Sequence, residues 1–192
     1  FIQGSQAINA DGVGDADVFA LAAKGGQIAI QGFFIRGGQN WGHRAFFPSH
    51  IQEVAEDEVL ARVLAQFYEE VPPPRTILVD RVLPDRELLE QAFGELAGRK
   101  VDISVPQRGD RRRLMEQASR NATEALDRRM AESGTQARTL RELAEFLELA
   151  DVPRRIEVYD NSHIQGTKAV GAMVVAGPEG LDRKSTRLNS SH

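Results

Sequence analysis

Four polar residues in the last quarter of the sequence could take part in metal or phosphate chemistry: Asp160, Asn161, Ser162 and His163. They follow the alternating segment RIEVY, which predicts a strand, so we expect Asp160 at the end of that strand and the next three residues in a turn. A carboxylate at a strand end stands where α/β folds bind ions and phosphates. Mg²⁺ prefers oxygen ligands, and two-metal phosphodiester hydrolysis needs several carboxylates around ions about 3.5–4 Å apart.

Asp160 has a simpler alternative interpretation, in which it and Asn161 only hydrogen-bond the backbone of their own turn. Glu157 lies three residues earlier, so strand alternation directs its side chain to the opposite face. His163 is close enough in the sequence to assist as a neighbour. The residues alone leave both interpretations of Asp160 open.

A second group of candidates consists of arginines at the start of a predicted helix: Arg108, Arg111, Arg112 and Arg113. Positive charge at this position opposes the helix dipole, at about 0.3–1 kcal/mol for each exposed charge. A phosphate backbone would offset this cost, because helix N–H groups and guanidinium groups both bind phosphate oxygens. Asp110 and Glu116 could instead balance the arginines within a solvated surface, and both interpretations stay open.

The segment RGGQNWGH, residues 36–43, combines glycines with an arginine, a tryptophan and a histidine. Trp41 could stack on a nucleic-acid base, but such a residue more often packs over its own sheet, and we expect that packing here. The segment lacks the G-K-[ST] ending of a P-loop. It leaves a small-molecule α/β enzyme as one alternative function.

The elements that would position these residues alternate along the chain. Apolar patterns predict strands over 17–23, 27–36, 44–48, 76–79 and 101–105, and helices over 56–70, 85–97 and 111–130. Gly25 and Gly26 predict a hairpin turn between the first two strands. The order β-β-β-α-β-α-β-α is typical of a mixed sheet with helices on its faces, as in the RNase H-like arrangement.

After these elements the sequence predicts a linker over 133–138 and a capping box of Thr139 and Glu142, which would begin a separate helix. The strand that leads to Asp160 then opens a second α/β unit. We therefore divide the chain into a loop, an α/β domain, a linker helix, a second unit and a tail: 1–16, 17–135, 136–153, 154–180 and 181–192.

The composition limits the possible partners. The net charge is −4, with 28 acidic and 24 basic residues among 192, so binding of nucleic acid would need local basic patches. The absence of cysteine excludes disulfides and Cys-ligated zinc, and fits a reducing cytoplasm. No apolar run of about 18 residues predicts a membrane span. The chain starts at Phe1 without a signal peptide, and we expect it to be an internal part of a longer protein.

Several segments together resemble one bacterial family: DVFALA at 17–22, FFIRGG at 33–38, QFYEEVPPP at 66–74, VPQRGDRRRLMEQASRNA at 105–122 and PRRIEVYDNSHIQGTKAVGAMVVAGPEG at 153–180. They are similar to the UvrC family, the excinuclease C subunits of nucleotide excision repair. The resemblance covers about residues 11–180, and its last two segments are long and distinctive.

The resemblance implies that Asp160 is the first metal-binding carboxylate of an RNase H-like endonuclease domain, which makes the 5′ cut beside a DNA lesion with Mg²⁺ or Mn²⁺. Ser162 and His163 belong to the same motif, but the family's catalytic histidine and other carboxylates lie beyond this sequence. Damaged double-stranded DNA and the excinuclease B subunit are the implied partners, the latter through a segment not present here. The four arginines are our candidates for contacts with the DNA backbone.

The resemblance also implies that this sequence holds only part of the machinery. Residues 17–135 would be a non-catalytic RNase H-like copy, because Asp17 begins a strand and no other carboxylates collect near it. Residues 154–180 would be the first two strands of the endonuclease domain, so we expect the fragment by itself to be inactive. We expect residues 181–192 to be a non-native disordered tail. A spacer that only separates two nucleases is the main alternative.

Overall fold

The computed structural model describes the backbone of residues 13–49, 53–164, 167–177, 180–181 and 187–190, and their side chains except those of 160–172 and from 177 onward. Of the predicted loop over 1–16, residues 1–12 therefore lie outside the described residues. The chain forms two units, Phe1–Asp127 and Arg128–His192. No helix in the described part of the chain is long and apolar enough to cross a membrane.

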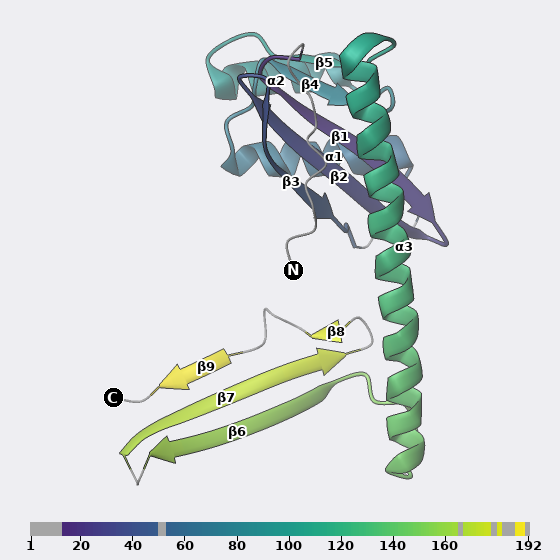
Figure 1. Ribbon diagram of the computed structural model, residues 1–192, viewed down its shortest axis with the longest axis vertical. Coiled ribbons are helices and arrows are strands. Elements are labelled where there is room, and N and C mark those ends of the chain that lie inside the picture. Colours follow the sequence, from purple (N-terminus) through teal and green to yellow (C-terminus); the bar gives the residue numbers. More distant parts are fainter. Residues whose placement is uncertain (1–12, 50–52, 165–166, 178–179, 182–186, 191–192) are drawn as a thin grey trace. The chain divides into compact units, whose positions relative to one another are not determined.

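The first unit is built on a five-stranded mixed sheet in the order β3-β2-β1-β4-β5 (Figure 1). The strands are β1 (Ala16–Lys24), β2 (Gln27–Arg36), β3 (Gln39–Phe46), β4 (Thr76–Val79) and β5 (Asp102–Ser104). The first three form an antiparallel meander, whereas β4 runs parallel to β1 and β5 runs parallel to β4. The mixed sheet is therefore confirmed, and β1 is its central strand.

Two glycine turns connect the meander. Gly25 and Gly26 join β1 to β2 with φ angles of 56° and 75°, and Gly37 and Gly38 join β2 to β3 with φ angles of 56° and 74°. Tight two-residue hairpins need positive φ at both positions, which glycine adopts without steric cost. The segment over 36–43 is thus a turn followed by strand, and β3 begins five residues before the strand we predicted over 44–48.

Both faces of β1 are buried because its sequence ADVFALAAK is apolar at nearly every position. Successive side chains point to opposite faces of a strand, so Phe19 and Leu21 pack into one apolar cluster, and Val18 and Ala20 into another. The core therefore has two halves, one on each side of the sheet.

Three helices cover these two halves. Helices α1 (Glu56–Glu70) and α2 (Arg86–Ala97) pack on the face that holds Phe19, and α3 (Gly109–Phe146) packs Leu114 and its neighbours on the other face (Figure 1). The order of strands and helices in this unit is the one that the sequence predicts.

The length of α3 differs from the prediction. We predicted a helix that ends near Met130 and a linker over 133–138, but α3 continues through both. The hydroxyl groups of Thr135 and Thr139 donate to backbone carbonyls four residues earlier, at 3.0 and 3.1 Å, so Thr139 lies inside a helix and does not cap a new one. The stretch contains no proline, and Gly134 costs only about 1 kcal/mol relative to alanine. The prediction of a separate linker helix over 136–153 was therefore wrong, because residues 136–146 belong to α3.

The second unit contains the last part of α3 and a four-stranded antiparallel sheet in the order β6-β7-β8, with β9 also paired to β7. The strands are β6 (Ile156–Ile164), β7 (Thr167–Gly177), β8 (Gly180–Leu181) and β9 (Arg187–Ser190). The two predicted strands of this unit are thus present as the β6–β7 hairpin.

The tail is partly ordered in the described residues, contrary to the prediction for 181–192. The backbone of β9 pairs with β7, opposite Val170 to Met173. A free strand edge offers unpaired N–H and carbonyl groups to any extended segment, so even a polar stretch such as RLNS can add to it. The non-native origin of the tail stays a prediction.

Candidate functional site

Asp160 lies in the middle of a strand and not at its end. β6 continues to Ile164, and the backbone of Asp160 is paired with Ala172 on β7. No glycine or proline interrupts the sequence between Arg155 and Gly166, and β7 pairs with β6 on both sides of Asp160, so the strand does not stop at the acidic residue. The predicted strand end was therefore wrong, although the predicted strand is present.

Asn161, Ser162 and His163 are consequently strand residues and do not form the predicted turn. The pairing of β6 with β7 shifts by one residue between Ser162 and Ile164, which is a β-bulge or similar irregularity close to His163. Bulges are frequent next to active sites because they redirect side chains. The side chains of Asp160, Ser162 and His163 lie outside the described residues.

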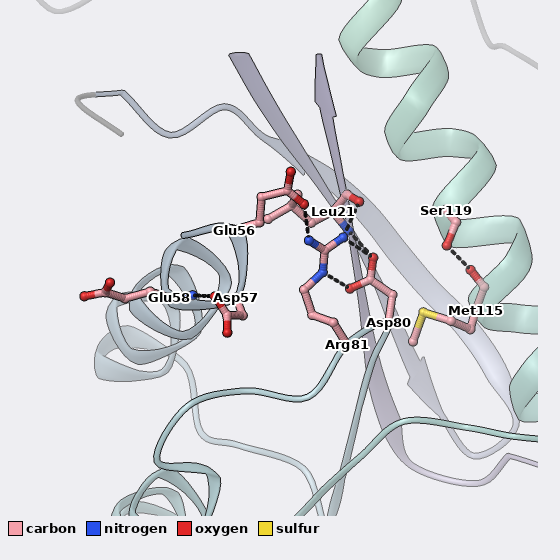
Figure 2. Close-up of polar contacts among 8 residues, drawn as sticks. All are labelled: Leu21, Glu56, Asp57, Glu58, Asp80, Arg81, Met115 and Ser119. Carbon is pink, nitrogen blue, oxygen red and sulfur yellow. Dashed lines mark hydrogen bonds and ion pairs between the residues drawn. The ribbon is translucent and has the colours of Figure 1, made fainter. Parts of the chain in front are cut away.

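The first unit contains a strand-end carboxylate that our sequence analysis missed. Asp80 directly follows β4, and its Oδ2 accepts a hydrogen bond of 2.9 Å from the backbone N–H of Leu21 on β1 (Figure 2). The pairing of β1 with β4 ends at Phe19 and Val79, so the Asp80 side chain satisfies β1 beyond the end of β4. The apolar run TILV followed directly by an acid could have predicted a carboxylate at a strand end.

Arg81 neutralises this carboxylate (Figure 2). Its Nε and Nη2 donate to the two oxygens of Asp80 at 3.0 and 3.1 Å, and Nη2 also donates to the carbonyl of Leu21 at 3.0 Å. Its Nη1 donates to Glu56. Burial acts to lower the pKa of Arg81, but the hydrogen bonds to Asp80 and Glu56 outweigh it and raise this pKa, so the guanidinium stays charged. A positive side chain thus occupies the space between two carboxylates.

The other acids at the start of α1 do not join this network. Asp57 accepts a hydrogen bond of 3.0 Å from the backbone N–H of Glu58, and Glu58 pairs with Arg62 one turn later at 2.6 Å. Figure 2 shows Glu58 directed away from Arg81. Only Glu56 among the three first-turn acids therefore reaches the site.

Asp17, near the start of β1, is completely buried and serves a structural purpose. Its Oδ1 accepts a hydrogen bond of 2.6 Å from Arg36, and its Oδ2 accepts one of 2.8 Å from the hydroxyl of Tyr68. Burial raises the pKa of Asp17 against the opposing effect of Arg36, and burial also raises the pKa of Tyr68. Both oxygens are thus held by protein donors. That Asp17 is not catalytic stays a prediction.

Among the described residues, no three His, Asp or Glu side chains come together in a way that could hold a metal ion. In the first unit, Asp80 and Glu56 bind Arg81, and Asp17 binds Arg36 and Tyr68. Metal-dependent hydrolysis needs several carboxylates that are open to the ions. Asp17, Glu56 and Asp80 are therefore each bound by donors of the protein itself.

The predicted basic group lies at the exposed start of α3. Arg112 pairs with Glu116 at 2.8 Å and Arg113 pairs with Asp110, and the hydrogen bond from Arg112 lowers the pKa of Glu116. The remaining two residues, Arg108 and Arg111, make no ion pair with any described residue. The structure thus confirms internal charge balance for half of the group. Exposed ion pairs contribute little to stability, so they leave the arginines available to other partners.

We expected Trp41 to pack over its own sheet, but it does not. It lies on β3 and exposes 76% of its surface. The surrounding segment is mainly strand and not a loop, which weakens the alternative of a small-molecule site built from that loop.

Comparison with known proteins agrees with this architecture. A family model described as the UvrC Ribonuclease H-like domain matches residues 15–129, and one described as the UvrC RNAse H endonuclease domain matches residues 144–190. The mixed sheet and these matches define an α/β protein of the ribonuclease H-like class. Within that class, the chain belongs to the UvrC family.

Relatives named UvrABC system protein C are similar along nearly the whole chain. The protein of Novosphingobium aromaticivorans is 77% identical over 181 residues, which cover 94% of this chain and 28% of that protein. The protein of Sphingopyxis alaskensis is 69% identical with the same coverages. The protein of Mesorhizobium japonicum is 55% identical, covering 97% of this chain and 27% of that protein. The chain thus spans little more than a quarter of the relatives it matches.

Proposed function

We propose that this chain is part of the DNA-incising subunit of bacterial nucleotide excision repair. In this proposal a non-catalytic RNase H-like unit precedes the beginning of the metal-dependent endonuclease domain that makes the 5′ cut. Membership of the UvrC family supports the assignment. The domain bounds 17–135 and 154–180 stay predictions, as does a cytoplasmic location.

The observation that carries the proposal is a correspondence between the two hairpins. Lys24 pairs with Gln27 at the end of β1, as Ile164 pairs with Thr167 at the end of β6. Asp160 lies four residues before the end of β6, and the residue four before the end of β1 is Ala20. Counted back from the hairpin end of the first strand, the first unit therefore has a buried alanine where the second unit has an acid. The partner strands differ by one residue, because the irregularity in β6 places Asp160 opposite Ala172, five residues after Thr167, whereas Ala20 lies opposite Gln31, four residues after Gln27.

The position of this alanine explains why an acid there would matter. Ala20 immediately precedes Leu21, whose backbone binds Asp80 at the end of β4. An acid on β1 at this point would join a strand-end acid, which is the convergence that metal-dependent hydrolysis requires. The first unit has alanine and not an acid at position 20, and Arg81 occupies the strand-end acid. Both differences support a non-catalytic first unit.

In the second unit, Asp160 would hold one divalent cation through its carboxylate oxygens, which Mg²⁺ and Mn²⁺ prefer as ligands. Such a cation stabilises negative charge on phosphodiester oxygens. Ser162 and His163 would line the same strand as motif neighbours. Further carboxylates would come from other parts of the whole protein, so the 192 residues alone would be inactive.

The partners in this proposal are damaged double-stranded DNA and the excinuclease B subunit, the latter bound by another part of the protein. The arginines at the start of α3 would contact DNA phosphates: Arg108, Arg111, Arg112 and Arg113. Their exposure and the N–H groups of the helix start support this role.

The test of the proposed function is incision by the full-length protein that contains this sequence. Asp160→Asn keeps the size of the side chain but removes its charge, and we expect 5′ incision to fall at least a thousandfold while DNA binding is retained. Glu157→Gln is the matched control, because Glu157 is an exposed acid on the same strand that binds Arg155 and Tyr159. Undiminished 5′ incision by the Asp160 variant would refute the proposal.

A second experiment separates DNA contact by the first unit from a pure spacer. Replacing Arg111, Arg112 and Arg113 with alanine in the full-length protein should weaken DNA binding. The slope of log affinity against log salt concentration should become shallower by about 0.9 for each lost phosphate contact. Unchanged affinity and an unchanged slope would favour the spacer.

A further inference from the structure

The exposed tryptophan on β3 has no role in the proposed metal chemistry. The side chain of Trp41 makes no hydrogen bond or ring contact with any described residue, and 76% of the residue's surface is exposed. The register between β2 and β3 shifts at this point, since Phe34 pairs with Gly42 and Ile35 pairs with Asn40. Trp41 is thus the extra residue of a β-bulge, a device that redirects a side chain and is frequent at functional sites.

The surroundings of Trp41 have a suitable charge for a polyanion. Residues 18–52 contain no Asp or Glu, although 28 of the 192 residues of the chain are acidic. The same stretch contains Lys24, Arg36 and Arg44 in addition to histidines. Lys24 pairs with Asp127 and Arg36 pairs with Asp17, so Arg44 is the one of the three that has no ion pair with a described residue. Asp17, the nearest acid before this stretch, is buried and bound by Arg36. An anionic partner that approaches β3 would therefore meet no negative side chain from residues 18–52.

Two exposed neighbours of Trp41 on β3, His43 and Arg44, are held in place on opposite faces of the strand. Arg44 lies over the ring of Phe46, with its guanidinium carbon 4.9 Å from the ring centre, and makes no ion pair with a described residue. The ring of His43 meets Phe33 edge-on, with ring centres 6.3 Å apart. β3 is the outer strand of the five-stranded sheet, so these side chains are accessible along its length (Figure 1).

We infer that β3 is a docking surface for single-stranded DNA, on which one unpaired base stacks on Trp41 while Arg44 contacts the adjoining phosphate. An exposed aromatic ring and a basic side chain on the same strand are the combination that binds unpaired bases without regard to sequence. The inference deepens the proposed function, on which it rests, because it adds unpaired bases to the DNA substrate. The duplex itself would not supply such a base.

Tryptophan fluorescence tests the inference directly, because Trp41 is the single tryptophan of the 192 residues. The chain is titrated with a single-stranded oligothymidylate, with a blunt duplex of the same length and with inorganic polyphosphate. We expect the oligothymidylate to quench the emission strongly, and the duplex and the polyphosphate to leave it nearly unchanged. Emission that does not change while oligothymidylate is seen to bind by fluorescence anisotropy would overturn the inference.

Variants separate stacking from charge. Trp41→Ala should weaken oligothymidylate binding between about fivefold and about a hundredfold, with the salt dependence unchanged. Trp41→Phe should restore most of the affinity. Arg44→Ala should make the salt slope shallower by about 0.7. Leu88→Ala is the control, since Leu88 is an exposed apolar residue on α2. Equal affinity of the Trp41→Ala variant and the unchanged chain would overturn the inference.

Two further outcomes are informative. Trp41→Ala could change self-association in sedimentation while oligothymidylate binding stays the same, which would make β3 a protein-docking edge and overturn the inference. Because no cleavage is measured, the inference can fail while Asp160→Asn still abolishes incision. Conversely, quenching of Trp41 with full incision by the Asp160 variant would refute the proposed function alone.

Discussion

The β1–β2 and β6–β7 hairpins are both antiparallel and have two residues between their strands, although only β6–β7 has a shift in register. Their first strands differ at the position four residues before the end of each strand. The first has Ala20, which is buried against α3, and the second has Asp160. A fold alone does not determine chemistry, which depends on the side chains placed on it. We propose that this one position on the first strand of each hairpin separates a structural copy from a candidate metal site.

The acids that the first unit does retain reinforce this difference. Asp17 and Asp80 stand at opposite ends of the β1–β4 pair, and each is bound by an arginine. Their number is therefore no guide to catalysis, because every oxygen involved already has a protein partner. Substitution of these acids and of their arginine partners distinguishes stabilisation of the fold from a ligand-binding role.

The largest expected effect is on the buried acid of the first hairpin. Asp17→Ala would leave the hydroxyl of Tyr68 and part of Arg36 without an acceptor, and should lower the free energy of unfolding by about 3 kcal/mol. Urea unfolding of the chain, followed by circular dichroism, measures this change. Asp15→Ala is the matched control, because Asp15 is exposed and accepts one backbone hydrogen bond. If the Asp17→Ala variant were as stable as the Asp15→Ala control, a structural role of Asp17 would be contradicted.

Arg81→Ala should have the next largest effect. It removes the donors that Asp80 and the Leu21 carbonyl use, and should lower the free energy of unfolding by about 2 kcal/mol. Arg62→Ala serves for comparison, since Arg62 forms an exposed pair with Glu58 on α1 and should cost less than about 0.5 kcal/mol. Equal effects of the two variants in urea unfolding would show that the Arg81 network does not stabilise the end of β4.

The pH dependence of stability should also identify Asp17. Burial raises the pKa of Asp17 in the folded protein, so the folded state holds this proton more tightly than the unfolded state. The resulting stabilisation is complete below the pKa of the unfolded chain, near 4, and is lost as pH rises through the raised pKa. Relative to Asp17→Asn, the unchanged chain should lose about 1.4 kcal/mol for each pH unit between the two pKa values. Urea unfolding from pH 3.5 to 7 tests the sign, and a relative gain of stability with rising pH would contradict it.

The smallest expected effect concerns α3. The sequence predicted a linker over 133–138, but the structure has one continuous helix there. Gly134→Ala should raise stability by about 0.5–1 kcal/mol, because an added Cβ meets nothing within 4 Å and alanine favours a helix. Gly98→Ala should do the opposite, since Gly98 ends α2 with a φ of 63°. Thermal unfolding measures both, and a loss of stability in the Gly134 variant would favour the predicted linker.

Sequence patterns predicted the elements of the first unit because apolar periodicity and glycine turns are local signals. The same reasoning failed where the signal was not local. Thr139 and Glu142 fit a capping box, but the helix before them simply continues. Asp160 looked like a strand end, although pairing with β7 extends β6 past it. Arg81 was missed because its role depends on Leu21, 60 residues away in the sequence. Trp41 was expected to be covered, but nothing in the strand order covers β3.

The central claim is that the acid of the second hairpin binds a divalent cation and that the strand-end acid of the first unit does not. Mn²⁺ titration of the full-length protein, followed by electron paramagnetic resonance, compares Asp160→Asn with Asp80→Asn. We predict that Asp160→Asn weakens Mn²⁺ binding at least tenfold and that Asp80→Asn leaves it unchanged. Unchanged Mn²⁺ binding by the Asp160 variant, or a loss of binding in the Asp80 variant, would contradict the claim.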